Sequence, residues 1–169
     1  MYEVFDIVNR DDEVIGHAAR SEVHGNPNLI HRVAHVLVFN SKGELYLQKR
    51  AEDKDVQPGK WDSSVGGHLA RGETYQEAAF RETEEELGIV NPDLHFLSKY
   101  IHSNDYESEY VTTFSCVYDG PIIIQQSEIE EGRFWKLDEV QYADPKLFTP
   151  NFLQEMDLYV KWQRQNMRR

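Results

Sequence analysis

The sequence contains little cysteine, a minority of basic residues and no long hydrophobic run. Its 169 residues include one cysteine, Cys116, so an internal disulfide is excluded and a reducing, cytoplasmic location is expected. Lys and Arg number 18 against 30 Asp and Glu, giving a net charge of −12. This charge argues against binding to nucleic-acid polymers or anionic membranes, which favour basic surfaces. No apolar stretch approaches the roughly 20 residues of a transmembrane helix, and the N-terminal residues lack the pattern of a secretory signal.

What is present fits one domain with an ordinary hydrophobic core. Hydrophobic residues make up 40% of the chain and aromatic residues 12%, enough for a core that needs neither disulfide nor metal. No repeat, low-complexity tract or linker rich in Pro, Gly and Ser divides the chain. We therefore expect a single domain over residues 1–169, with Cys116 buried as a small hydrophobe.

Hydrophobic patterning predicts several strands, one helix near the middle and one at the end. The residues over 21–28 are expected to form a loop because Gly25 and Pro27 interrupt them. The expected strands, of which the first two pairs form hairpins, cover residues 4–7, 14–15, 32–39, 44–49, 61–65, 94–102, 109–117 and 133–137. A closing helix is expected over 151–165. This order predicts an α+β fold, an α/β/α sandwich in which helices flank a mixed β-sheet.

The central helix is expected over residues 75–87. Thr74 and Glu77 form a capping-box signature, and Gly88 suits a left-handed C-terminal cap. One arc is expected to face the core, with Ala79, Phe80, Thr83 and Leu87.

Three glutamates lie on a neighbouring face of this helix. Glu82, Glu85 and Glu86 are spaced i, i+3 and i+4, which gathers them within about a third of the helix circumference. Each like-charged pair at i, i+4 costs an isolated helix about 0.2–0.5 kcal/mol. A divalent cation would reverse that cost, since Mg²⁺ binds hard oxygen ligands and commonly joins carboxylates to substrate phosphates. The alternative is a solvated acidic helix face.

The residues around these glutamates favour the metal site. The pattern Gly-x5-Glu-x7-Arg-Glu-U-x-Glu-Glu-x-Gly-U, in which U is an aliphatic-type position, runs over residues 67–89. Every fixed position matches, from Gly67 through Glu73 and Arg81 to Gly88. This pattern is the Nudix box. Through it the chain resembles the Nudix family, and the resemblance implies the Nudix fold.

The resemblance also implies an enzyme, a hydrolase that cleaves a diphosphate linkage by water attack at phosphorus. The implied cofactor is Mg²⁺ or Mn²⁺, and the implied ligands are Glu82, Glu85, Glu86 and the carbonyl of Gly67. Arg81 would orient a glutamate, Glu73 would brace the loop, and Glu85 and Glu86 complete the implied catalytic set. The general base, in the helix or in a loop outside it, is left open. The expected partner is a small-molecule diphosphate, such as a nucleoside diphosphate derivative, and a homodimer is left open.

A second resemblance is to the isopentenyl-diphosphate isomerase branch of the family. A His-x6-His pair precedes the first long strand, a Gly-His dipeptide follows the Trp strand, and a Glu-x-Glu precedes a later strand. These features imply a second metal site, preferring Mn²⁺ or Zn²⁺, at His24, His31, His68, Glu107 and Glu109. The alternatives are hydrogen-bonding loop histidines and solvated loop carboxylates.

Two departures separate the chain from the isomerases. Gly66 stands where the isomerase has its catalytic cysteine, and Lys146 follows the late proline where the isomerase has a tryptophan. Glycine cannot shuttle a proton to an alkene, so a hydrolase is the expected function. An isomerase-like enzyme and a non-catalytic, nucleotide-sensing Nudix domain remain as alternatives, although a complete metal face counts against the sensor.

Overall fold

The computed structural model describes residues 3–54 and 56–167, whose strands form one curled sheet. The strands are β1 (Val4–Val8), β2 (Val14–Ala19), β3 (Ile30–Phe39), β4 (Leu45–Arg50), β5 (Trp61–Asp62), β6 (Val65–His68), β7 (His95–Ser103), β8 (Ser108–Val117) and β9 (Ile129–Trp135). The helices are α1 (Arg20–Val23), α2 (Tyr75–Leu87), α3 (Leu137–Tyr142) and α4 (Pro150–Met167), with a 3-10 turn at Pro145–Leu147. Within these described residues, no helix is long and apolar enough to cross a membrane.

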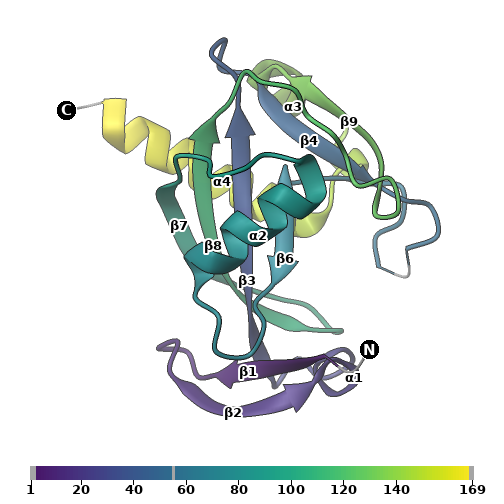
Figure 1. The fold of residues 1–169 in the computed structure, drawn as a ribbon, viewed down its shortest axis with the longest axis vertical. Coiled ribbons are helices and arrows are strands. Elements are labelled where there is room, and N and C mark those ends of the chain that lie inside the picture. The colour runs from purple at the N-terminus through teal and green to yellow at the C-terminus, as the bar shows by residue number, and fades with distance from the viewer. Residues whose placement is uncertain (1–2, 55, 168–169) are drawn as a thin grey trace.

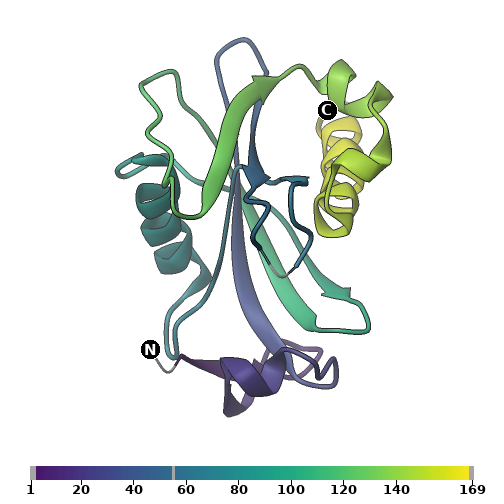
Figure 2. The same cartoon turned by 90° about the vertical axis from the view of Figure 1, so that its right-hand side faces the viewer.

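Strand β3 is the centre of the sheet. It pairs in parallel with β8 along its whole length, from Ile30 opposite Ser108 to Phe39 opposite Val117. It also pairs antiparallel with β1 and β6, and at one position with β4, so the sheet is mixed as predicted. Helix α2 covers one face and α4 the other (Figures 1 and 2). The predicted sandwich of helices around a mixed sheet is confirmed.

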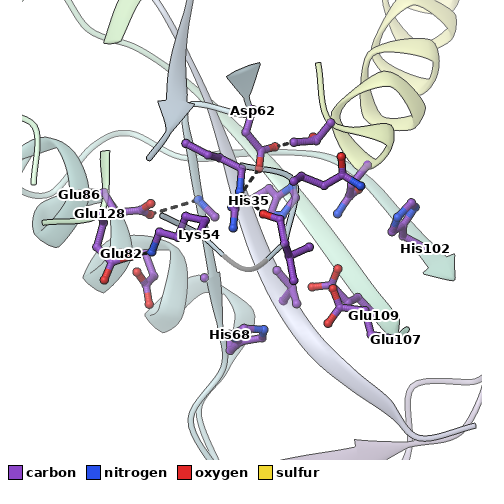
Figure 3. Close-up of a pocket in the computed structure, with 18 of the residues that line it drawn as sticks. His35, Lys54, Asp62, His68, Glu82, Glu86, His102, Glu107, Glu109 and Glu128 are labelled. Carbon is purple, nitrogen blue, oxygen red and sulfur yellow. Dashed lines mark hydrogen bonds and ion pairs between the residues drawn. The ribbon is translucent and has the colours of Figure 1, made fainter. Parts of the chain in front are cut away.

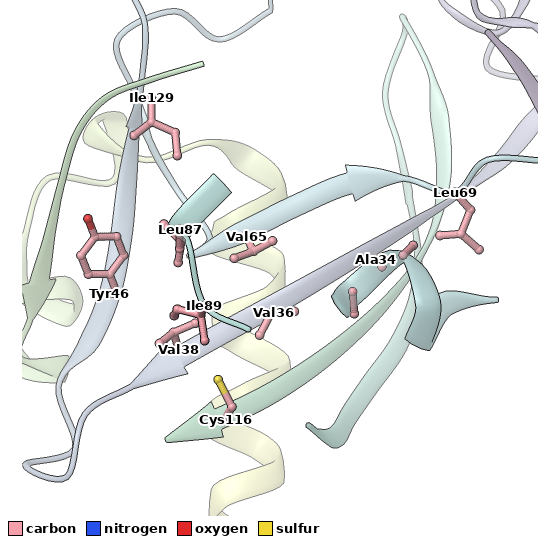
Figure 4. Close-up of a cluster of buried hydrophobic side chains, with 12 residues drawn as sticks. Ala34, Val36, Val38, Tyr46, Val65, Leu69, Leu87, Ile89, Cys116 and Ile129 are labelled. Carbon is pink, nitrogen blue, oxygen red and sulfur yellow. The ribbon is translucent and has the colours of Figure 1, made fainter. Parts of the chain in front are cut away.

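The two faces of β3 contribute side chains to two hydrophobic cores because successive side chains of a strand point to opposite sides. Ala34, Val36 and Val38 join the core beneath α2, which also holds the buried Cys116, as predicted (Figure 4). Leu37 joins the core beneath α4. Burial on both sides explains why β3 is a continuous apolar run rather than an alternating one.

Helix α2 has the predicted bounds and caps. The Thr74 hydroxyl accepts a hydrogen bond from the Glu77 backbone, and the Glu77 carboxylate accepts one from the Thr74 backbone. Gly88 has a φ of 68°, in the left-handed region, and its N–H donates to the Glu84 carbonyl.

The buried arc of α2 is rotated relative to the expected one. Phe80 is only half-buried and lies outside the core cluster, whereas Ala78 and Glu86 are buried with Ala79, Thr83 and Leu87. The reason is that the helix packs on β3 and β6. That contact turns part of the glutamate face inward.

Three expected elements in the first half of the chain differ in the structure. The expected loop over 21–28 contains the short helix α1, anchored by the fully buried Val23. The second expected hairpin pairs only at Phe39 and Leu45, because β4 leaves β3 to pair with β9. The single strand expected over 61–65 is two strands, since Ser64 hydrogen-bonds to the backbone of Tyr46 and Val38 and interrupts the run.

In the second half, the strand expected over 133–137 runs from Ile129 to Trp135, and Leu137 instead begins α3. The closing helix begins one residue earlier and ends two residues later than expected.

Asp12, in the turn between β1 and β2, joins four segments of the fold. Its carboxylate accepts from Arg32 Nε at 2.8 Å and from the Tyr75 hydroxyl at 3.0 Å, and lies 2.5 Å from Lys99 Nζ. These partners belong to β3, α2 and β7. Burial alone would raise the pKa of Asp12, but the hydrogen bonds from Lys99 and Arg32 outweigh it and lower the pKa below 3.8. Asp12 therefore stabilises the packing of the N-terminal hairpin against the sheet and α2.

Asp12→Asn should lower the free energy of unfolding at pH 7 by roughly 1–3 kcal/mol, since hydrogen bonds to a charged group are lost. Because the folded-state pKa of Asp12 is lowered, its carboxylate contributes to stability above about pH 3.8. This contribution is lost as the pH falls through the folded-state pKa. Chemical denaturation at pH 7 and in acid measures both effects. The control is Asp11→Asn, a neighbouring exposed carboxylate. Equal losses in the two variants would contradict the assignment to Asp12.

Candidate active site

A cavity of about 670 Å³ gathers most of the residues that the sequence singles out (Figure 3). Among the predicted residues, those that line it are His24, Gly67, His68, Arg81, Glu82, Glu85, Glu86, Glu107 and Glu109. Glu73 and His31 lie behind this lining, in contact with it through Arg81 and Glu107. The cavity thus brings together the α2 glutamates and the histidines, which are far apart in the sequence.

Glu86 is the most buried glutamate of α2, with 7% of its surface exposed. Its carboxylate accepts from the Gln48 amide at 3.0 Å and from the Gly66 backbone at 3.1 Å, both neutral donors. Burial raises the pKa of Glu86 to about 8, and the nearby charge of Glu82 adds to the rise. Glu86 therefore lies among donors that do not neutralise its charge.

Glu82 is half-buried against Gly67. A Cβ atom at position 67 would collide with the Glu82 carboxyl group, which explains why this position of the box is glycine. Burial raises the pKa of Glu82, opposed by its bond with Arg81. Glu85, by contrast, is exposed at the rim of the cavity.

Arg81 connects the glutamates of the box to one another. Its guanidinium donates twice to Glu73, at 2.9 and 2.8 Å, and once to Glu82, at 2.6 Å. It also donates to the His68 carbonyl at 3.1 Å and lies 3.5 Å from the Glu85 carboxylate. The bond with Glu73 is the largest cause that raises the pKa of Arg81. This charged network holds the loop of residues 68–73 against the first turns of α2.

Four of the predicted second-site residues converge on one point. Each of His24, His31, His68 and Glu107 offers one ligand atom, and these atoms lie within 4.8 Å of one another. Glu109 lies outside this set of four, with its carboxylate 4.0 Å from His31 Nε2. The sheet explains the convergence, because β3 lies between β6, which carries His68, and β8, where Glu109 is in register with His31.

Burial favours the neutral form of two histidines of this cluster, His31 and His68. His31 is fully buried, and neither of its ring nitrogens has a hydrogen-bond partner among the described residues. Burial, together with the neighbouring His24, lowers the pKa of His31 to about 4. Burial also lowers the pKa of His68 well below 6.5. Burial, together with the charge of Glu107, raises the pKa of Glu109 to about 8. Neutral imidazoles are the form that binds metal ions.

Sequence reasoning did not find a buried pair that also borders the cavity. His35 Nδ1 lies 2.8 Å from the carboxylate of Glu155, which is 1% exposed. A signal was present in both elements. His35 interrupts the apolar run of β3, and Glu155 lies in the same helical stripe as Phe152 and Met156, where an apolar residue is expected.

Comparison with known proteins identifies the family of the chain. The NUDIX domain family matches residues 29–156. Over 154 residues the chain is 36% identical to the uncharacterized Nudix hydrolase PA4841 of Pseudomonas aeruginosa, covering 90% of each chain. It is 34% identical over 159 residues to the uncharacterized Nudix hydrolase YfcD of Escherichia coli K12, covering 94% of this chain and 87% of the relative.

A solved structure extends the likeness to the fold. The crystal structure of DR0079 from Deinococcus radiodurans superposes with a TM-score of 0.74 at 25% identity, covering 96% of this chain and 98% of that one. The family match and the relatives all include the box of residues 67–89. The chain belongs to the Nudix hydrolase family, whose enzymes act on phosphorus-containing acid anhydrides.

Proposed function

We propose that this hydrolase cleaves the diphosphate linkage of a small molecule, a nucleoside diphosphate derivative or a related organic diphosphate, by metal-dependent attack of water at phosphorus. The observation that supports this most is the cluster of three glutamates beside Gly67 in one cavity, with Glu86 buried among neutral donors. Burying negative charges in such a cluster costs free energy unless a cation or a cationic complex binds to it.

The residues present fit Mg²⁺ or Mn²⁺ at Glu82, Glu85, Glu86 and the Gly67 carbonyl. All four offer hard oxygen atoms, as these ions prefer, and Arg81 is shared among Glu73, Glu82 and Glu85. When bound, the metal would offset the charge of the phosphate oxygens and acidify the attacking water.

The protein's own residues would orient this site and move the proton. Arg81 fixes the Glu82 carboxylate through its 2.6 Å bond, and Glu73 holds Arg81 from the other side. Glu85, exposed at the rim, and Glu86, at the floor of the site, are the two box carboxylates available to accept the proton of water. A carboxylate outside the helix is the third choice for this role.

We further propose a second metal site at His24, His31, His68 and Glu107, with Glu109 beside it. The support is the common point within reach of all four ligand atoms and the buried imidazole of His31. Three imidazoles and a carboxylate favour Mn²⁺ or Zn²⁺ over Mg²⁺. Because His24, His68 and the α2 glutamates border the same cavity, both sites would face one substrate.

The histidine cluster also favours a second candidate, an isomerase of prenyl diphosphates. Against it, position 66 has no side chain that could carry a proton, and a Cβ atom there would stand 3.1 Å from the His35 ring. A nucleotide sensor without catalysis is the third candidate, and the complete box counts against it.

The test is release of phosphorylated products from a panel of nucleoside diphosphate derivatives, dinucleoside polyphosphates and prenyl diphosphates, with Mg²⁺ and Mn²⁺ compared. We expect metal-dependent hydrolysis of at least one member. Isopentenyl diphosphate should give no dimethylallyl product. Binding of a nucleotide without turnover would support the sensor, and catalytic formation of dimethylallyl diphosphate would support the isomerase.

Glu86→Gln should lower turnover of the best panel substrate by about 100-fold or more, since a charged oxygen ligand becomes a neutral group of the same shape. The matched control is Glu84→Gln, an exposed glutamate of the same helix that does not line the cavity. Circular dichroism and thermal melting establish that both variants fold. A Glu86→Gln enzyme with near wild-type turnover would exclude Glu86 as a ligand.

The second site predicts a transition metal that stays with the protein through purification without added metal. Elemental analysis should find it in the wild type and find less in His31→Ala and in His24→Ala, the less buried partner. His95→Ala is the control, because His95 is exposed on β7 and outside the cluster. Equal metal content in all four proteins, or none in the wild type, would leave only the α2 site.

A further inference from the structure

The pair formed by His35 and Glu155 has no part in either proposed metal site. Glu155 projects from α4 and receives hydrogen bonds from His35, from the Ser63 hydroxyl, from the Thr113 hydroxyl at 2.6 Å and from the Tyr100 hydroxyl at 3.5 Å. These four donors come from β3, from the residue after β5, from β8 and from β7. The carboxylate is therefore fixed from several sides, and it fixes the His35 ring in turn.

The opposite edge of the ring belongs to the cavity. His35 lines it between the α2 glutamates and Glu107 and Glu109 (Figure 3). The Cδ2–Nε2 edge lies against Gly66, where an added Cβ atom would be 3.1 Å away. The hydrogen bonds of the described residues include none to Nε2. Among the described residues, the hydrogen bond of the ring is thus made at Nδ1.

Charges around the ring favour its cationic form. Burial lowers the pKa of His35, but the charge and hydrogen bond of Glu155 outweigh it, and the pKa rises to about 9. The same contact lowers the pKa of Glu155 against the effect of burial. The other titratable or charged groups that face the ring or share its pocket are Asp62, Glu86, Glu109, His68 and Arg50. Of these, Arg50 is itself paired with Asp62 at 3.5 Å.

We propose that His35 is a further substrate-contacting residue, whose Nε2–H donates a hydrogen bond to an oxygen of the diphosphate group while Glu155 holds the ring in position. The identity of the anionic ligand rests on the proposed function. A phosphate oxygen is a strong acceptor for a charged N–H donor, and a fixed donor loses little entropy on binding. Glu155 is in this view a positioning residue.

A purely structural role for the pair, joining α4 to the sheet, makes a different prediction. It would change the stability of the protein without changing the pH dependence of the reaction or the response of His35 to a ligand. The experiment therefore needs a measurement that does not depend on the stability of the protein.

The first measurement compares wild type, His35→Gln, Glu155→Gln and the exposed control His95→Gln on the best panel substrate at saturating Mg²⁺. His35→Gln should lower kcat/KM by roughly 10- to 100-fold, the loss expected for a hydrogen bond to a charged group. Glu155→Gln removes the charge that favours the imidazolium, so the alkaline fall of kcat/KM should move by more than one unit below its wild-type position near pH 9. The control should match the wild type in both respects.

The second measurement needs no turnover. In protein labelled with ¹⁵N-histidine, the Nε2 resonance of His35 should shift when methylenediphosphonate and Mg²⁺ are added. The resonance is assigned by its loss in His35→Gln. If that variant does not fold, the resonance is assigned by its titration near pH 9. The resonance of His95 should stay in place. This measurement separates the role of His35 from the proposed hydrolysis. A protein that is inactive on the whole panel would overturn the proposed hydrolysis, and the shift of the His35 resonance could still be measured.

Two results would overturn the role of His35. One is a folded His35→Gln variant whose kcat/KM lies within twofold of the wild type. The other is an Nε2 resonance that does not move although other resonances show that methylenediphosphonate binds.

Discussion

Burial of strand β3 on both faces is the constraint on which the rest of the structure depends. Its parallel pairing with β8 and antiparallel pairing with β1 and β6 leave no exposed backbone along most of its length. Each side chain must therefore fit a core or a cavity. Alternation along the strand sends Val36 and Val38 to the α2 core and Leu37 to the α4 core. The two histidines of the strand, His31 and His35, belong to neither core cluster and instead meet polar groups from other elements.

The position of the candidate active site follows from these histidines of β3. His31 comes into register with Glu109 on β8, and His35 is paired across the sheet with Gly66 on β6. The box of residues 67–89 continues directly from β6 into α2, so its glutamates reach the cavity that the histidines border. A sheet that places an acidic loop–helix segment beside buried imidazoles gathers many ligating atoms in a small volume. The raised pKa values of Glu86 and Glu109 reflect burial first and the charges of neighbouring carboxylates second.

Two sets of cationic contacts offset carboxylate charges elsewhere in the fold. Arg81 is shared among carboxylates of the box and orients them, while Asp12 receives Arg32 and Lys99 at the far end of α2 and keeps the N-terminal hairpin in place. Neither contact reaches Glu86, whose partners are neutral. The charge that remains is located where a metal ion and a phosphorylated substrate would enter.

The sequence by itself determined the family, the central helix with both caps, the alternation of most strands and the box residues, because each depends on neighbours within a few positions. Tertiary structure alone decided what depends on packing between distant segments. It rotated α2 so that Ala78 and Glu86 are buried, split the strand at Ser63 and Ser64, and separated β4 from β3 after a single pair. It also joined His35 to Glu155, which lie 120 positions apart. No local pattern encodes such a pairing, since it arises only when α4 packs across the face of a completed sheet.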